Sequence, residues 1–356
     1  MVLICAMMLN VSTVFAAPAR TILTREEAVR LATENSIELK KLSLEVDSNR
    51  EQEQKTDDAY FRNPTAAAFV DYETNKMQNS LARALTEQNI TKQRDMIGFL
   101  VSQYFISIMQ AETSYRQFEE SLVLEEKEFQ ITEVKRKLGM ISEVDYMNKK
   151  AAYEKNIASK VSYQESIDNA YRTLNRLVGA ELDTKYNLTY NVTYSELGEF
   201  DLDSHIAKVK QNDRTLQTLE TNIQRTRYSL EQYNMANHNP ATGEITEGRV
   251  SQESLRRDLD SYSLQKAERN KAIEDTFIAK HDAILVQERQ YEEKLIELEN
   301  MKKQLAIREV QLELGRLTEL EVENYKFSIL RLENEIQKLV YDHRMNIIEF
   351  SNINLM

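Results

Sequence analysis

The sequence predicts an all-α protein built from long antiparallel helical hairpins in a coiled-coil-like arrangement. The first observation is that only seven glycines and three prolines occur in 356 residues, which leaves little material for turns. The second is that 29% of the residues are charged while apolar residues recur about every 3.5 to 3.6 positions, as in helices that bury one stripe. The third is an internal repeat, which indicates a tandem duplication of a three-helix unit.

The repeat is clearest in two short segments, 138–145 and 314–321. In each segment a glycine ends one helix, and a Ser or Thr followed by an acid three residues later forms a capping box that begins the next. The glycines, Gly139 and Gly315, lie 176 residues apart. The same offset carries one period-seven apolar stripe onto another, from Val101, Ile108, Tyr115, Leu122 and Phe129 to Phe277, Ile284, Tyr291, Leu298 and Leu305.

We therefore expect a first helical repeat at residues 17–178, an inter-repeat linker at 179–200 and a second repeat at 201–356. The elements expected in the first repeat are a helix at 24–60, an irregular stretch at 64–74 with a hint of a strand at 69–72, a long helix at 75–138 and a helix at 142–178. In the second repeat a break at 239–243 precedes a long helix to 314 and a last helix to about 350. The first and third helices of the first repeat together match the long one, which predicts that they lie end to end along it.

Residues 1–16 form an uncharged, mostly apolar segment that ends in small residues, and this pattern predicts a secretory signal peptide although the usual basic start is missing. The apolar run is too short to span a bilayer, which takes about 20 residues. The single cysteine, Cys5, lies inside it, so no thiol is expected in the mature chain. We expect an exported protein of the cell envelope or periplasm.

Sequence motifs for catalysis are lacking. The four histidines are scattered without an HExxH pairing, and we find no phosphate-binding glycine loop and no nucleophile elbow. A net charge of −12 without a basic stripe disfavours nucleic acid as a partner. We therefore expect no enzymatic activity, no cofactor and no metal site.

The order of signal peptide, duplication, helical hairpins and a glycine tip in each half resembles the TolC family of outer-membrane efflux proteins. Three further stretches are similar to that family: the helix opening at 23–32 with Asn35 after it, the run at 137–142, and Leu177-Val178-Gly179 at the end of the first half. The resemblance implies a homotrimer whose helices close into a hollow tube, associated with the outer membrane if the cell has one. It also implies a periplasmic adaptor (membrane fusion) protein and an inner-membrane pump as partners.

The resemblance places adaptor docking at the two tips, where the alternative is that these residues simply make tight turns. The implied docking residues are Leu138, Gly139, Met140, Ile141, Ser142, Leu314, Gly315, Arg316, Leu317 and Thr318. Glu321 is a candidate acid at the tunnel mouth, although Asn324 does not complete an acidic pair. Family members insert two membrane β-strands into each half, which takes ~25 residues, and both available stretches are shorter, so these strands are expected to be missing or vestigial.

Two functions follow from this interpretation. The first is a TolC-like export or efflux component that forms or contributes to a helical duct and docks an adaptor. The second is a non-transporting scaffold or spacer of the cell envelope, built from the same hairpins. One clean apolar stripe favours a monomeric bundle, because a tube wall also needs contacts on its sides, whereas two retained tips favour the duct.

Overall fold

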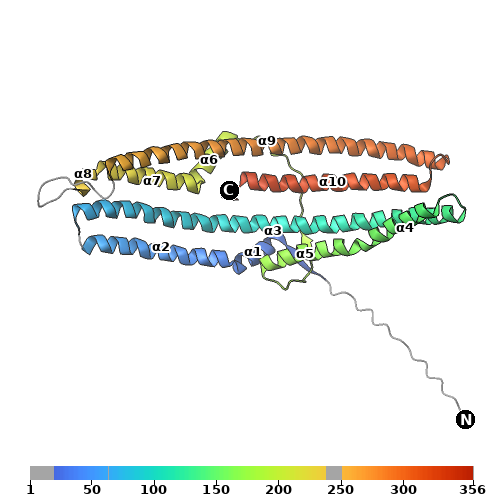
Figure 1. Cartoon of the computed structure of the whole chain (residues 1–356), viewed down its shortest axis with the longest axis horizontal. Coiled ribbons are helices and arrows are strands. Elements are labelled where there is room, and N and C mark those ends of the chain that lie inside the picture. Colours follow the sequence, from blue (N-terminus) through green and yellow to red (C-terminus); the bar gives the residue numbers. More distant parts are fainter. Residues whose placement is uncertain (1–19, 63, 238–250, 356) are drawn as a thin grey trace, which may run out of the picture.

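The computed structural model describes residues 20–62, 64–237 and 251–355. The predicted signal peptide (1–16) and the predicted break at 239–243 lie outside the described residues. The described part is an elongated bundle whose long helices run roughly along one axis (Figure 1). The all-α fold class and its long antiparallel hairpins are thereby confirmed.

In the first half, one long helix serves as the spine for shorter ones. Its elements are β1 (Thr21–Thr24), α1 (Arg25–Asn35), α2 (Ile37–Arg62), α3 (Ala66–Lys137), α4 (Glu143–Ala158), α5 (Lys160–Val178) and β2 (Tyr186–Thr189). Both the α1–α2 pair and the α4–α5 pair pack along α3 (Figure 1). The end-to-end arrangement predicted from helix lengths is therefore present.

The second half follows the same plan around α9. Its elements are α6 (Leu202–Asn212), α7 (Arg214–Glu231), α8 (Tyr233–Ala236), α9 (Gln252–Glu313), α10 (Glu319–Ser351) and the short 3₁₀ helix η1 (Ile353–Leu355). Helices α6 and α7 cover one part of α9, and α10 covers the rest. The halves thus share one order of helices, while a duplication as their origin and the exact repeat boundaries stay predictions.

The irregular stretch predicted at 64–74, with its hint of a strand, is wrong. Pro64 does end α2, as expected, but α3 begins at Ala66 and is 72 residues long, or ~108 Å. Thr65 caps it, because its hydroxyl accepts a hydrogen bond from the Ala68 amide at 3.1 Å. Three successive alanines then favour the helix, so the cap and helix propensity outweigh the proline.

The first helix of each half is broken where the sequence predicted continuity. Ser36 separates α1 from α2 and accepts the Leu39 amide at 3.2 Å. Asp213 separates α6 from α7 and accepts the Leu216 amide at 2.8 Å. In both places a side chain caps a new helix, because these short polar residues compete with the helical backbone for its amide groups.

A two-stranded parallel sheet was not expected from the sequence. Strand β2 lies within the predicted linker and pairs with β1, with Thr21 opposite Tyr186. The buried Tyr171 of α5 holds β2 in place, since its hydroxyl lies 2.9 Å from the Tyr186 carbonyl oxygen. The linker therefore packs against the first half before it enters the second.

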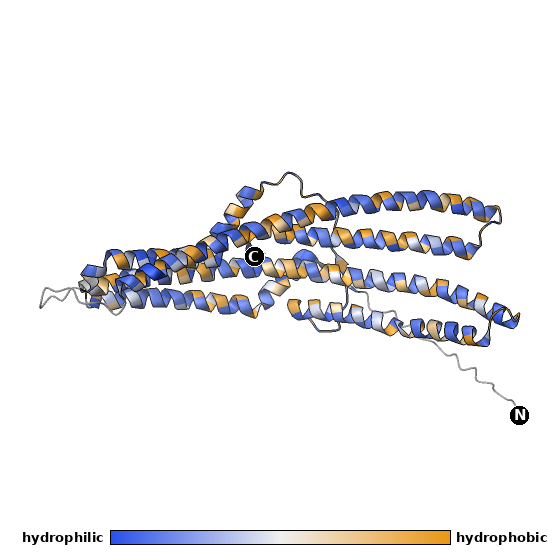
Figure 2. Ribbon diagram, turned by 45° about the horizontal axis from the view of Figure 1, so that its top comes forward, coloured by the Kyte–Doolittle hydropathy of each residue, from blue (hydrophilic) through white to orange (hydrophobic). Residues whose placement is uncertain are grey.

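Each half buries an apolar core of its own. One cluster combines β1, α1, α3 and α5 around Val101, Phe105 and Ile108, and the other combines α6, α7, α9 and α10 around Phe277 and Ile284. Apolar residues lie in stripes along helices that are otherwise polar (Figure 2). The two halves meet where α3 packs on α7 and α10.

The link between α2 and α3 is three residues long, and its described residues contain no strand. Its counterpart in the second half lies mostly outside the described residues. No helix in the described part of the chain combines the length and apolar character needed to cross a membrane.

Candidate docking site at the hairpin tips

The chain reverses direction twice at one end of the bundle. We call residues 138–142, between α3 and α4, the first tip, and residues 314–318, between α9 and α10, the second tip. Both tips lie at the same end of the molecule (Figure 1). The structure therefore brings together the two predicted segments, which are far apart in the sequence.

The two tips have the same backbone. The Met140 amide donates to the Lys135 carbonyl at 2.8 Å, and the Arg316 amide donates to the Gln311 carbonyl at 2.8 Å. Each glycine has a positive φ, 70° in the first tip and 67° in the second. This is a Schellman turn, in which a residue with a Cβ atom would be strained.

The surfaces of the tips are open. A Cβ atom added to either glycine would meet nothing within 4 Å. Leu138 and Met140 are each 67% exposed, and Leu314 is 63% exposed. Packing inside this chain therefore does not explain why these apolar residues stand at both tips. Ile141 and Leu317 are half-buried.

Ser142 and Thr318 both cap the helices that follow them, and the predicted capping box has both of its bonds at Thr318 but not at Ser142. The Ser142 hydroxyl accepts the Asp145 amide at 3.0 Å, and the Thr318 hydroxyl accepts the Glu321 amide at 3.3 Å. The Glu321 carboxylate in turn accepts the Thr318 amide at 2.8 Å, which completes a capping box. Hydrogen bonds from the backbone and hydroxyl of Thr318 lower the pKa of Glu321, so this group is negative at neutral pH.

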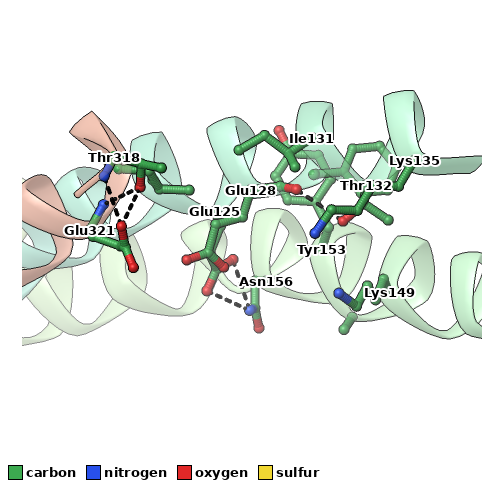
Figure 3. A pocket seen from close by; sticks show the side chains of 13 residues that line it. Glu125, Glu128, Ile131, Thr132, Lys135, Lys149, Tyr153, Asn156, Thr318 and Glu321 are labelled. Atoms are coloured by element: carbon green, nitrogen blue, oxygen red, sulfur yellow. Dashed lines mark hydrogen bonds between the residues drawn. The ribbon is translucent and has the colours of Figure 1, made fainter. Parts of the chain in front are cut away.

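A groove lies between the two hairpins just behind the tips. Its volume is about 650 Å³, and it is bounded by α3, α4 and the start of α10 (Figure 3). Phe129, Tyr153 and Leu320 form its apolar part. Glu125 lines the groove, and the Asn156 side-chain amide donates hydrogen bonds of 2.9 Å to both of its carboxylate oxygens (Figure 3). Glu321 also lines the groove (Figure 3). Whether Glu321 also contributes to a ring of acids at a tunnel mouth stays a prediction.

Two polar contacts hold the hairpins together near this groove. The Lys127 ammonium lies 2.5 Å from the Glu323 carboxylate, and the Asn324 side chain donates to Glu128 at 3.0 Å. Sequence reasoning considered Asn324 only as a missing acid and did not identify this role. The partners lie 196 positions apart in the sequence, so no local periodicity indicates that they pair.

Three of the four histidines, His205, His281 and His343, lie in the described residues, and none of them belongs to a metal-binding group there. His343 lies 3.3 Å from Glu288 within the second half, and His205 is enclosed by Phe200, Phe277 and Phe350. Within residues 20–62, 64–237 and 251–355, no group of three or more His, Cys, Asp and Glu residues could hold a metal ion.

Comparisons with known proteins find the fold but no close relative. No protein-family model and no curated protein sequence matches the chain. Among solved structures, the chain is similar to CusC, described in a study of transmembrane channel formation, with 12% identity, a TM-score of 0.63 and coverage of 96% of this chain and 95% of that one.

Two further structures show the same likeness. The CmeC outer membrane channel of Campylobacter jejuni has 11% identity and a TM-score of 0.61 over 93% of this chain and 85% of its own. The outer membrane protein VceC of Vibrio cholerae has 10% identity and a TM-score of 0.62 over 92% of this chain and 95% of its own. The chain therefore has the TolC-like fold of outer-membrane channels that its sequence predicts.

Proposed function

We propose that this protein is an export or efflux component of the cell envelope, in which copies of the chain enclose a helical, water-filled duct. By analogy with the fold, the assembly is a homotrimer that is exported through its signal peptide and acts with an inner-membrane pump. Transport then depends on the shape and the inner surface of the duct, without catalysis and without a cofactor. The transported substrate is left open.

The observation that carries the proposal is the pair of exposed apolar tips at one end of the bundle. Leu138, Met140 and Leu314 are each more than 60% exposed, on turns whose geometry requires only the glycines. A group of exposed apolar side chains at one place often marks an interaction surface, whereas single scattered ones do not. We infer that a periplasmic adaptor protein docks there, next to the groove between the hairpins.

A scaffold that does not transport would use the same helices but would need no adaptor at the tips. The two functions therefore differ in what contacts the tips. Site-specific photo-crosslinking in the living cell distinguishes them, with the crosslinker placed at Met140 or at Arg316, both exposed and neither needed for the turn. Phe61 is the matched control, because it is 71% exposed and belongs to the last turn of α2, a helix that ends away from the tips (Figure 1).

We expect both tip positions to capture an adaptor protein, identified by mass spectrometry, and the Phe61 position to capture none. Replacing Leu138 and Leu314 with Ser should weaken capture from Met140, whereas Phe61→Ser should leave it unchanged. Equal capture from all three positions, or no adaptor at either tip, would overturn the docking assignment.

A further inference from the structure

A second groove lies farther from the tips, on the seam where α3 of the first half packs against α10 of the second. Its volume is about 320 Å³, near the lower end of the range of ~300–1,000 Å³ that small-molecule sites occupy. Arg331, the lining residue nearest to the start of α10, lies ~18 Å along that helix from Glu319. We call this cavity the seam groove.

The α3 wall of the seam groove is uncharged and largely unpaired. It consists of Gln110, Thr113, Ser114 and Gln117. Gln117 accepts a hydrogen bond of 2.8 Å from the side chain of Asn334, which lies on the opposite wall. The side chains of the other three form no hydrogen bond with another described residue. Amides and hydroxyls both donate and accept hydrogen bonds, so this wall can pair with the hydroxyl groups of a ligand.

The α10 wall adds two cations without an acidic partner. Arg331 and Lys338 stand about two turns apart, and neither forms an ion pair with another described residue. The acids between them are paired elsewhere, since Glu333 and Glu335 lie 2.7 and 3.5 Å from lysines of α9. Glu335 is the only acid among the described residues that line the groove. The lining therefore carries a net positive charge, on a chain whose net charge is −12.

The seam groove has a different lining from the groove behind the tips. Phe129 and Leu320 give the tip groove an apolar part, and Glu125 and Glu321 give it negative charge. Among the described residues that line the seam groove, none is aliphatic, and Tyr341, which is 7% exposed, is the one aromatic. A lipophilic molecule or a cation therefore finds no complementary surface there. A ligand that matches the seam groove is polar and negatively charged.

We propose that the seam groove binds a small acidic sugar of the hexuronate class. Arg331 and Lys338 hold its carboxylate, because guanidinium and ammonium groups form charge-assisted hydrogen bonds with carboxylate oxygens. The α3 wall pairs with the ring hydroxyls, whereas a simple anion without hydroxyls would leave that wall unused. Binding requires neither the duct nor an adaptor, so the inference does not rest on the proposed function.

Ligand-observed NMR titration of the full chain tests the ligand class with three probes. Glucuronate carries both the carboxylate and the hydroxyls, glucose lacks the carboxylate, and acetate lacks the hydroxyls. A ligand of this size is expected to bind with a Kd on the order of 1 mM. Glucose should bind about tenfold more weakly than glucuronate, because it forms no charged hydrogen bond. Acetate should also bind more weakly, because it leaves the α3 wall unpaired.

Three results of the titration would overturn the proposal. Equal binding of glucuronate and glucose would leave the two cations without a role. Equal binding of glucuronate and acetate would leave the α3 wall without a role. Failure of glucuronate to bind at about ten times the expected Kd would remove the site altogether.

Variants place the binding in the seam groove. Arg331→Gln with Lys338→Gln should weaken glucuronate binding about tenfold, to the level of glucose. The matched control is Arg256→Gln with Lys271→Gln, which changes two exposed cations of α9 outside the groove and should leave binding unchanged. Both pairs are exposed, so circular dichroism should show the same helical content in each. Equal losses in the two double variants would indicate binding by overall charge and would overturn the site.

A last variant tests the α3 wall by itself. Thr113→Val removes a hydroxyl without changing the charge, so it should weaken glucuronate binding and leave acetate binding unchanged. Glucuronate binding that survives this change in full would overturn the assignment to a sugar. Glucuronate binding in a protein whose tips capture no adaptor would keep the seam groove and overturn only the docking assignment.

Discussion

Gly179 should be far less tolerant of alanine than the tip glycines, although all three have nearly the same backbone. It ends α5 with φ 76°, compared with 70° at Gly139 and 67° at Gly315. A Cβ atom at Gly179 would lie 2.8 to 2.9 Å from three atoms of the Asn35 side chain, whereas one at either tip would meet nothing within 4 Å. The comparison therefore separates backbone strain from steric contact.

The expected magnitudes follow from these distances. Left-handed backbone costs a residue other than glycine about 1 to 2 kcal/mol, so Gly139→Ala and Gly315→Ala should each destabilise the protein by about that amount. Gly179→Ala carries the same strain and also displaces Asn35, whose amide group lies 3.5 Å from the Leu177 carbonyl oxygen. Losing a hydrogen bond adds about 0.5 to 1.5 kcal/mol, which predicts a total of about 1.5 to 3.5 kcal/mol.

Urea unfolding followed by circular dichroism measures all three variants under one condition. Asn35→Ala combined with Gly179→Ala should recover the steric part of the loss, giving a coupling energy between the two positions. The reasoning is refuted if the three single variants lose equal stability, or if Asn35→Ala does not relieve the effect of Gly179→Ala.

Two further predictions concern the cores. Ile108→Ala and Ile284→Ala, at positions 0% and 2% exposed, should each cost about 2 to 5 kcal/mol in urea unfolding. Because they lie in separate clusters, their costs should add within about 0.5 kcal/mol, and a larger departure would show that the cores are coupled. Burial among aromatic rings lowers the pKa of His205, so unfolding takes up a proton and stability should fall as pH drops below about 6.5. His205→Phe should flatten that acid-side decline in thermal unfolding, and an unchanged pH profile would assign it to other groups.

Features repeated along the chain could be predicted from the sequence, because each depends on local chemistry. Glycine spacing located both tips, and the period-seven stripes located the core faces around Ile108 and Ile284. The caps at Ser142 and Thr318 could be predicted from the acidic residue that stands three positions after each of them. In each case the physical cause lies within a few residues of the feature that it produces.

Features that depend on long-range pairing were missed. Strand β2 forms because β1, more than 160 residues away, offers it an edge and Tyr171 fixes its backbone, and no periodicity within residues 186–189 indicates this. The breaks at Ser36 and Asp213 had a local signal, since both are good capping residues 177 positions apart. An apolar stripe runs through each position, from Val29 to Val46 and from Ile206 to Ile223, and it concealed the break.

Exposed apolar residues on α9 change the weight of one argument drawn from the sequence. A single apolar stripe favoured a monomeric bundle, but Leu264, Ile296 and Ile307, each at least 59% exposed, form a second one on α9. The step of eleven from Ile296 to Ile307 also returns to the same side of a helix. Contacts between the halves, in contrast, include polar side-chain pairs such as Lys127 with Glu323, while each apolar core stays within one half. The exposed apolar face of α9 is therefore directed away from the core of its own half.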